Sequence, residues 1–461
     1  MTARRSPYQL ELDLPIPDLG EARRRNLREI EAAAATTASE SPASTEQLME
    51  VICSPDNIEV ALQSVVRNKG APGIDGITVK QLPGILKARW REIEEQLLQG
   101  RYQPQPVRRV QIPKPDGGGV RNLGIPTTID RVIQQAILQR LQPLWDPTFS
   151  ERSYGFRPGR SAHQAVMQAQ TYVIEGYRFV VDIDLAKFFD RVNHDRLMAA
   201  VAARVSDRRV LRLIRSYLTA GVLHSGLFEE SREGTPQGGP LSPLLSNLVL
   251  DELDRELERR GHRFVRYADD CNIYVRSEAA GVRVMRSVTH FIEGRLKLKI
   301  NVDKSAVARP WDRSVLSFTF KNDIDFPRRI ADKAVARFKH RVRELTARHR
   351  GITLERMIKE MTSYLHGWAV YFGLSQLREL QSLDSWIRRR LRCVAWVQWK
   401  TPRRRFHELR RLGISERMAF PAILSPKGPW RLSLSEAMHR GLTKARFRRL
   451  GLPTMALLGT A

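Results

Sequence analysis

The sequence predicts an α+β fold, with an antiparallel sheet in its middle part and a helical, basic C-terminal part. Residues 107–125 contain two alternating apolar segments on either side of a Gly-rich stretch, a pattern typical of a β-hairpin. Strongly apolar segments at 178–185 and 264–275 predict further strands, the second of them a hairpin with a tight turn. Beyond about residue 328, apolar residues recur at helical spacing, and basic residues fill the positions between them.

Helices are expected before, between and after these strands. The segment 129–141 has helical apolar spacing and is expected to stop at Pro143, because proline cannot donate the backbone hydrogen bond that continues a helix. Residues 244–260 predict an amphipathic helix. Two more apolar stripes, at 354–372 and 380–394, predict long helices in the C-terminal part.

The first 45 residues predict a flexible extension that lies outside the core. They show little apolar periodicity, and small or polar residues fill 32–39. A charged helix around 21–31 is the one regular element expected there, and an ordered region is expected to begin near residue 46.

The charge balance indicates a soluble protein with a polyanionic partner. The 461 residues include 77 Lys and Arg against 50 Asp and Glu, which gives a net charge of +27. Such an excess needs a counter-surface, for which nucleic acid is the first candidate and an anionic membrane the rival. No apolar run of about 18 residues could span a bilayer, and no signal core follows Arg4 and Arg5. We therefore expect a cytoplasmic protein of bacterial or organellar origin.

Two adjacent acids, Asp269 and Asp270, occupy the turn of the second predicted hairpin. Neighbouring carboxylates repel each other, and divalent cations remove that cost. Two cations about 3.5–4 Å apart, held by these acids and a third one, can activate a hydroxyl and stabilise a leaving phosphate. Mg²⁺ suits such a site, because it takes few carboxylates together with water and substrate oxygens. Asp182 and Asp184 on the strand 178–185 are candidates for the third acid, and the alternative is a solvated acidic turn.

Several sequence blocks occur in an order that resembles one family. The blocks are Asn68–Gly76, Ile112–Lys114 with Arg121 and Gly124–Pro126, Ser153–Ser161, Asp182–Asp190, Gly234–Pro243, Arg266–Asp270, and Leu298–Asn301 with Lys304. Together they resemble group II intron–encoded proteins, the reverse transcriptase–maturases of bacteria and organelles. The resemblance covers about residues 55–400. The ordered set is far more specific than any single block.

The resemblance implies a right-hand polymerase with fingers, a palm built on an antiparallel sheet, and a helical basic thumb. The expected division is a flexible extension at 1–45, fingers at 46–175, a palm at 176–327, a thumb or maturase X domain at 328–400, and a basic DNA- or RNA-binding segment at 401–461. The implied activity is RNA-directed DNA synthesis that copies intron RNA into cDNA. The implied partner role is to bind the intron RNA and assist its splicing and mobility.

The resemblance also implies the catalytic residues. Asp184, Asp269 and Asp270 would be catalytic and would hold two Mg²⁺ ions, with Mn²⁺ as a substitute, while Asp182 would be a local structural acid. Phe188 would be the aromatic gate under the nucleotide sugar that excludes a 2′-hydroxyl, with core packing as the alternative for it or its neighbour.

The remaining residues implied by the resemblance would contact the incoming nucleotide. Lys114 and Arg121 would place positive charge over the triphosphate. Pro236 and Gln237 would shape and contact the nucleotide pocket, and Lys304 would contact the triphosphate or primer. Without the family, the cations would read as solvated side chains of a hairpin.

Two further regions are interpreted through the same resemblance. The block 153–161 would face template RNA, with a packing turn as the alternative for Tyr154 and Phe156. The basic residues of 328–350 would follow phosphates in a sequence-independent way. The tryptophans at 386, 396 and 399 are expected in the thumb core.

The chain departs from the family pattern in three places. Ser and Thr stand within 314–320, where the family has Phe-Leu-Gly. The three cysteines, at 53, 271 and 393, form no Cys-x-x-Cys pair, so we expect no disulfide, no structural zinc and no HNH endonuclease, as in the endonuclease-lacking lineage. The basic run 427–431 fits the short C-terminal segment of that lineage. The first 45 residues match no part of the family pattern.

The expected partners are group II intron RNA, an RNA template with a DNA or RNA primer, target DNA and dNTPs. No membrane partner is expected, and a homodimer is left open. Two alternatives remain at this point: a splicing factor without polymerase activity, and a domesticated relative that serves DNA repair or defence. The intact acids Asp184, Asp269 and Asp270 favour an active polymerase over the first.

Overall fold

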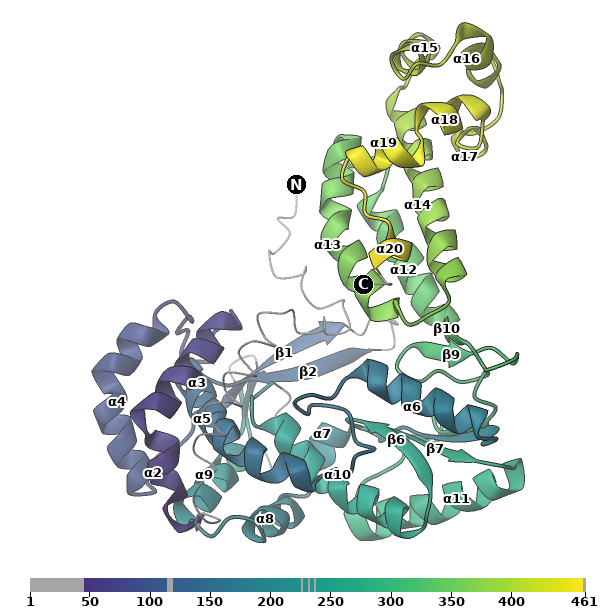
Figure 1. The fold of residues 1–461 in the computed structure, drawn as a ribbon. Coiled ribbons are helices and arrows are strands. Elements are labelled where there is room, and N and C mark those ends of the chain that lie inside the picture. The colour runs from purple at the N-terminus through teal and green to yellow at the C-terminus, as the bar shows by residue number, and fades with distance from the viewer. Residues whose placement is uncertain (1–44, 114–118, 225–226, 231–232, 236–237, 459–461) are drawn as a thin grey trace. The chain divides into compact units, whose positions relative to one another are not determined.

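The computed structural model describes residues 45–458 except for 114–118, 225–226, 231–232 and 236–237. The chain forms two compact units, which meet in sequence between Arg313 and Ser314. Figure 1 shows the elements of both units. The helix expected around 21–31 lies outside the described residues.

The first unit opens with helices that pack around one long helix. These are η1 (Thr45–Gln47), α2 (Leu48–Cys53), α3 (Pro55–Arg67), α4 (Leu82–Leu98) and α5 (Thr128–Trp145), and α2, α3 and α4 all contact α5. Thr127 caps α5 by accepting a 3.1 Å hydrogen bond from the backbone N–H of Asp130. The expected stop at Pro143 is wrong, because the helix continues to Trp145. A proline in the last turn removes one backbone bond only, which buried neighbours such as Leu141 and Trp145 offset.

A first sheet of four strands has the order β2-β1-β4-β5. β1 (Val107–Pro113) and β2 (Val120–Ile125) form an antiparallel hairpin, which confirms the prediction for 107–125. β4 (Val222–His224) pairs with β1 in parallel, and β5 (Leu227–Glu229) closes the edge. The tip of the β1–β2 hairpin falls in 114–118, outside the described residues.

A second sheet is antiparallel throughout, with the order β6-β7-β3-β8. Its strands are β3 (Phe179–Ile183), β6 (Arg263–Tyr267), β7 (Asp270–Val275) and β8 (Ala306–Ala308), so both predicted strand segments are confirmed. Helix α6 (Ala162–Ile174) contacts β6 and β7, while α11 (Glu278–Phe291) contacts β3, β7 and β8 (Figure 1). Helix α10 (Ser242–Arg259) packs on β6 and confirms the helix predicted at 244–260.

The remaining elements of the first unit are short. They are η2 (Asp146–Thr148), α7 (Phe188–Arg191), α8 (His194–Ala202), α9 (Arg208–Thr219) and η3 (Ile292–Leu296). One apolar core runs through the unit from Leu48 to Ile300 and joins the helical layer to the second sheet. Its members Ile133, Val181 and Leu250 have no exposed surface. Burial of such side chains contributes about 1.5–3 kcal/mol each, which makes this sheet a rigid base for its loops.

The second unit begins with a two-stranded sheet, β9 (Phe318–Phe320) and β10 (Arg328–Ile330). Three long helices follow and lie against one another, α12 (Asp332–Leu345), α13 (Leu354–Phe372) and α14 (Leu377–Gln398) (Figure 1). The two apolar stripes predicted at 354–372 and 380–394 are thereby confirmed as α13 and α14. Among the described residues of this unit, six short helices follow: α15 (Pro402–Arg411), α16 (Glu416–Ile423), α17 (Pro429–Leu432), α18 (Glu436–Gly441), α19 (Lys444–Arg449) and α20 (Met455–Leu458).

Aromatic rings form the centre of the three-helix part of this unit. Trp368 lies 4.3 Å from the ring centroid of Phe338 and 4.4 Å from that of Phe372, and all three side chains are buried. Trp396 is buried as expected, whereas Trp386 and Trp399 are only partly buried. Among the described residues, no helix is long and apolar enough to cross a membrane.

Candidate active site

The register of the second sheet brings three carboxylates to one end of its central strands. Ile183 on β3 pairs with Cys271 on β7, so the next residue along β3, Asp184, lies across from Asp270. Asp270 also pairs with Tyr267 on β6, which leaves only Ala268 and Asp269 in the β6–β7 loop. Residues 86 positions apart in sequence, Asp184 and Asp270, are therefore neighbours, as a local pattern alone could not establish.

Electrostatic coupling within this group is strong. Burial of the carboxylate and repulsion from Asp269, Asp184 and Asp182 raise the pKa of Asp270 to about 7. Burial, followed by repulsion from Asp184, also raises the pKa of Asp269. Asp270 is exposed as a residue at the end of its strand, so water reaches part of its side chain. Because that burial is incomplete, repulsion from the neighbouring acids must contribute to its raised pKa as well. The group is poised to gain from a bound cation.

Asp182 differs from the other acids because it already has a partner. Arg313 holds one oxygen of this carboxylate through two donors at 2.8 and 2.9 Å. Burial still raises the pKa of Asp182, and Arg313 opposes that rise. The guanidinium also donates to the backbone carbonyl of Lys304. This ion pair is what a structural acid would make, and it leaves Asp184 as the strand acid that faces the turn.

A loop at residues 301–305 fixes the backbone of Asp184. The backbone N–H of Asn301 donates to the Asp184 carbonyl at 2.8 Å, and the Ser305 hydroxyl accepts from the Asp184 N–H at 3.0 Å. Lys304 of the same loop places its Nζ 3.6 Å from Asp184 Oδ2. Sequence reasoning missed Ser305, because a serine after a lysine carries no signal of its own.

Two exposed cations flank the carboxylates. These are Lys304 and Arg121, of which Arg121 lies on β2. The positive charge of each lowers the pKa of Asp269 and so opposes its rise, which places both cations near this carboxylate. Three other predicted nucleotide contacts, Lys114, Pro236 and Gln237, lie outside the described residues.

The two rings after Asp184 have different surroundings. Phe188 is 2% exposed and belongs to the core, whereas Phe189 is only partly buried. Their centroids lie 5.2 Å apart in an edge-to-face arrangement. The gate assignment to Phe188 stays a prediction, and the structure makes Phe189 the more accessible ring.

The block 153–161 is largely a packing turn. The guanidinium of Arg157 is buried, pairs with Asp146 at 2.8 Å and donates to the carbonyls of Ser150 and Ser153. Tyr154 is also buried, at 6% exposed. Phe156 has a positive φ of 59° and is 36% exposed. Of these side chains, Phe156 is the one free to meet a template.

The donor set of the site fits divalent metal ions. The three carboxylates supply oxygen ligands, which Mg²⁺ prefers, and a cation would relieve the repulsion that raises the pKa of Asp269 and Asp270. In the described part of the chain, no three His, Cys, Asp or Glu side chains lie close enough together to hold a metal ion by themselves, so water and substrate oxygens would have to supply part of the ligand set. Open sites completed by water and substrate are typical of Mg²⁺.

Two basic side chains of the second unit lie against an aromatic ring. Lys339 and Arg343 on α12 lie over the ring of Trp386, 5.9 and 5.7 Å from its centroid. Other basic residues hold the unit together instead, as Arg329 does through its 3.0 Å pair with Glu379.

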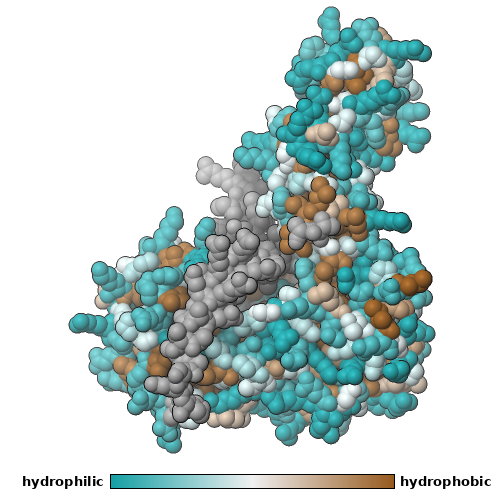
Figure 2. Space-filling model, in the orientation of Figure 1, coloured by the Kyte–Doolittle hydropathy of each residue, from teal (hydrophilic) through white to brown (hydrophobic). Residues whose placement is uncertain are grey.

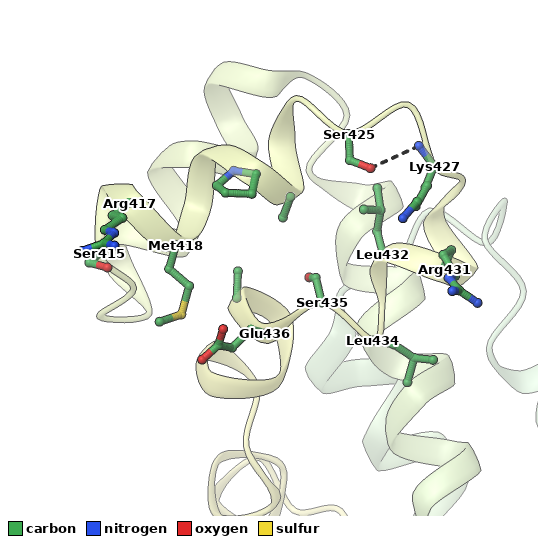
Figure 3. Close-up of a pocket in the computed structure, with 13 residues that line it drawn as sticks. Ser415, Arg417, Met418, Ser425, Lys427, Arg431, Leu432, Leu434, Ser435 and Glu436 are labelled. Carbon is green, nitrogen blue, oxygen red and sulfur yellow. Dashed lines mark hydrogen bonds between the residues drawn. The ribbon is translucent and has the colours of Figure 1, made fainter.

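A wide hollow of about 700 Å³ opens among α16, α17 and α18 (Figure 3). Arg417, Lys427 and Arg431 line it beside apolar Leu432 and a single acid, Glu436. In Figure 2 the visible face of these short helices is largely hydrophilic. The hollow therefore combines an apolar floor with a basic rim.

An antiparallel sheet that carries three acidic residues at one end of its central strands β7 and β3, flanked by basic side chains, defines the palm of a nucleic-acid polymerase. Comparison with known proteins supports that class. The reverse transcriptase (RNA-dependent DNA polymerase) family matches residues 112–323, and the group II intron maturase-specific domain matches residues 335–413.

Individual relatives agree. Protein YkfC of Escherichia coli K12 is 34% identical over 322 residues, which cover 61% of this chain and 84% of that protein. The group II intron-encoded protein LtrA of Lactococcus lactis is 37% identical over 209 residues, 45% of this chain and 35% of LtrA. Nuclear intron maturase 2 of Arabidopsis thaliana mitochondria is 29% identical over 177 residues, 30% of this chain and 24% of that protein. The chain belongs to the group II intron–encoded reverse transcriptase and maturase family, and its fold is that of a right-hand polymerase.

Proposed function

We propose that the chain is a Mg²⁺-dependent RNA-directed DNA polymerase that uses Asp184, Asp269 and Asp270 as its catalytic carboxylates. The observation that carries this proposal is that the β3–β7 register sets Asp184 across from Asp270, next to Asp269 in the β6–β7 loop, with the pKa of Asp269 and Asp270 raised by burial and by repulsion among these acids. Two Mg²⁺ ions, when bound there, would supply the charge that activates a primer hydroxyl and stabilises the leaving phosphate.

The neighbouring groups have roles that follow from their positions. Asn301 and Ser305 fix the backbone of Asp184, which keeps this residue beside Asp269 and Asp270. Lys304 and Arg121 provide positive charge where a triphosphate would lie. Lys114, Pro236 and Gln237 would complete the nucleotide pocket, as the family resemblance implies.

We also propose that the second unit binds the intron RNA and the target DNA. Lys339 and Arg343 near Trp386 suit phosphates of a duplex, and the basic rim of the α16–α18 hollow suits a second nucleic-acid segment. The division into fingers at 46–175, palm at 176–327, thumb at 328–400 and a C-terminal binding segment at 401–461 follows from these roles. We place the intron RNA, a primed RNA template, target DNA and dNTPs as its partners.

Primer extension on an RNA template tests the polymerase proposal. Asp269→Ala should lower Mg²⁺-dependent extension of a DNA primer by at least about a thousandfold, which corresponds to about 4 kcal/mol of lost transition-state stabilisation. Intron RNA binding should stay within a factor of about two, because a negatively charged carboxylate makes no favourable contact with RNA phosphates that the substitution could remove. Asp303→Ala, an exposed acid in the loop beside Lys304, is the matched control and should extend normally. Substantial synthesis by Asp269→Ala would overturn the metal-site assignment.

A further inference from the structure

One buried ion pair stands directly behind the carboxylate turn. Arg266, on β6, and Asp254, on α10, have fully buried side chains. Two donors of the guanidinium meet the two carboxylate oxygens at 2.6 and 2.7 Å. Because a buried pair costs desolvation energy that apolar residues would not, its presence here calls for a reason beyond stability.

The third arm of the guanidinium reaches the loop itself. Arg266 Nη1 donates to the carbonyl of Ala268 at 2.9 Å and to the side-chain oxygen of Asn247 at 3.0 Å. The amide of Asn247 in turn donates to the carbonyl of Gly155 at 2.9 Å. A single planar fork thus links helix α10, the β6–β7 loop and the segment before α6, and lysine could not make these contacts together.

Gly155 packs directly against the backbone of the β6–β7 loop. A methyl group on Gly155 would lie 2.3 Å from the backbone nitrogen of Ala268, so no side chain fits between the two segments. The neighbouring backbone is bound to β6, with the Tyr154 N–H donating to the Arg266 carbonyl at 2.9 Å. Ala268 itself has a φ of 57°, a conformation that is unfavourable for a non-glycine residue and persists only where its surroundings enforce it.

The Arg266–Asp254 pair acts on the loop by fixing its position, and its electrostatic effect on the neighbouring acids is small. Asp254 cancels the charge of Arg266 at 2.6 Å, so the pair presents little net field to the neighbouring acids. Arg266 supplies a fixed hydrogen-bond donor to Ala268, the residue that precedes Asp269. A shift of the Ala268 carbonyl would move the carboxylate of Asp269 relative to Asp184.

We propose that Arg266, Asp254, Asn247 and Gly155 form a clamp that positions the Ala268–Asp269 loop for metal binding. In this role Arg266 is a positioning residue, which acts on the metals through the loop. The proposal rests on the proposed metal site of Asp184, Asp269 and Asp270. It adds residues that touch neither metal nor substrate.

The test measures Mn²⁺ binding to the full chain by electron paramagnetic resonance, without nucleic acid, together with the affinity for a primer–template duplex and the melting temperature. Arg266→Lys keeps a charge for Asp254 but loses the fork, and Gly155→Ala displaces the loop without touching the ion pair. Both should bind Mn²⁺ at least tenfold more weakly and bind the duplex within twofold of the unaltered chain. Leu97→Ala, in the core of α4, is the control for lost stability, and should melt earlier yet keep its Mn²⁺ affinity.

A second glycine controls for the added methyl group. Gly84 lies in α4, and a methyl there would meet no atom outside its own helix within 4 Å. Gly84→Ala should therefore leave the Mn²⁺ affinity and the duplex affinity unchanged, while its melting temperature should not fall, because alanine favours a helix more than glycine does. If Gly155→Ala binds Mn²⁺ within twofold of the unaltered chain, or if Arg266→Lys lowers the melting temperature but not Mn²⁺ affinity, the clamp is overturned and the network is only structural. Mn²⁺ binding that Asp269→Ala leaves unchanged would instead overturn the metal site, and the clamp with it.

Discussion

The carboxylate group should cost the metal-free protein stability, and replacing Asp270 by asparagine should recover part of it at alkaline pH. In the folded chain the pKa of Asp270 is raised from 3.8 to about 7. Below pH 3.8 the group is protonated in both folded and unfolded chains, so it carries no penalty. Between these values the unfolded chain releases the proton that the folded chain keeps, and stability falls as the pH rises. Above about pH 7 the full penalty is present.

The size of the effect follows from the pKa difference. Each unit of pKa difference corresponds to about 1.4 kcal/mol, so a rise from 3.8 to about 7 sets a ceiling of about 4 kcal/mol. Because Asp270 is exposed as a residue, solvent screening lowers this value, and we expect about 1–2 kcal/mol. The unfolding entropy is about 2.1 cal/mol/K per residue, so for 461 residues that unfold together this corresponds to a gain of about 1–2 °C in melting temperature.

The assay is thermal unfolding of the full chain in EDTA from pH 4 to pH 8.5. The melting temperature of Asp270→Asn should exceed that of the unaltered chain at pH 8, and the difference should vanish toward pH 4. Asp56→Asn, an exposed acid of α3, should show no such pH-dependent gain. Added Mg²⁺ at pH 8 should stabilise the unaltered chain more than Asp270→Asn. A variant that is no more stable at pH 8, or whose gain is the same at every pH, would refute this reasoning.

Three further predictions concern other parts of the chain. Phe189→Ala should raise incorporation of rNTP relative to dNTP if the partly buried ring is the gate, whereas Phe188→Ala should do so only if the buried ring is. Phe188→Ala should also cost about 3–5 kcal/mol of stability as a core truncation. Ser317→Gly should raise stability by up to about 1 kcal/mol in denaturant unfolding, since Ser317 has a φ of 67° that glycine adopts freely; a loss of stability would contradict this. Replacing both Lys427 and Arg431 by glutamate should weaken DNA or RNA binding. The slope of log Kd against log salt concentration should decrease by an amount that corresponds to about two phosphate contacts, while primer extension at saturating duplex stays unchanged.

The departure from the family pattern near residue 317 has a structural consequence. The chain has Ser and Thr within 314–320 instead of the glycine of the family pattern, and both Leu316 and Ser317 adopt positive φ. The turn is thus kept without the residue that favours it. The hydroxyl of Ser317 accepts a 3.3 Å bond from Arg337, and its carbonyl accepts from Ala331, so hydrogen bonds compensate part of the strain.

Several features were readable from sequence because they depend on local periodicity. Apolar spacing predicts the hairpin at 107–125, the helix at 244–260 and the two long C-terminal helices. The spacing repeats every two residues in a strand and about every 3.6 residues in a helix, so a short stretch of sequence is enough to show it. Pro143 shows the limit of such rules, because its cost depends on how near the helix end lies and on what packs around it.

The residues behind the active site were harder to find. Asn247 and Asp254 are seven residues apart on one face of α10, and polar residues on a buried face are a signal that could have been noticed. Their partner in the first half of the unit, Gly155, could not be found this way. Its requirement is the distance to Ala268, which no property of the local sequence encodes.

The sequence by itself determined the class of the protein: the order of its blocks, its excess of positive charge and the paired acids Asp269 and Asp270. Tertiary structure decided what those acids can do. It set Asp184 across from Asp270 through the β3–β7 register, and it gave Asp182 an ion pair with Arg313. The physical reason is that repulsion, burial and hydrogen-bond geometry depend on separations of a few ångströms between segments, and folding sets those separations through contacts distant in sequence.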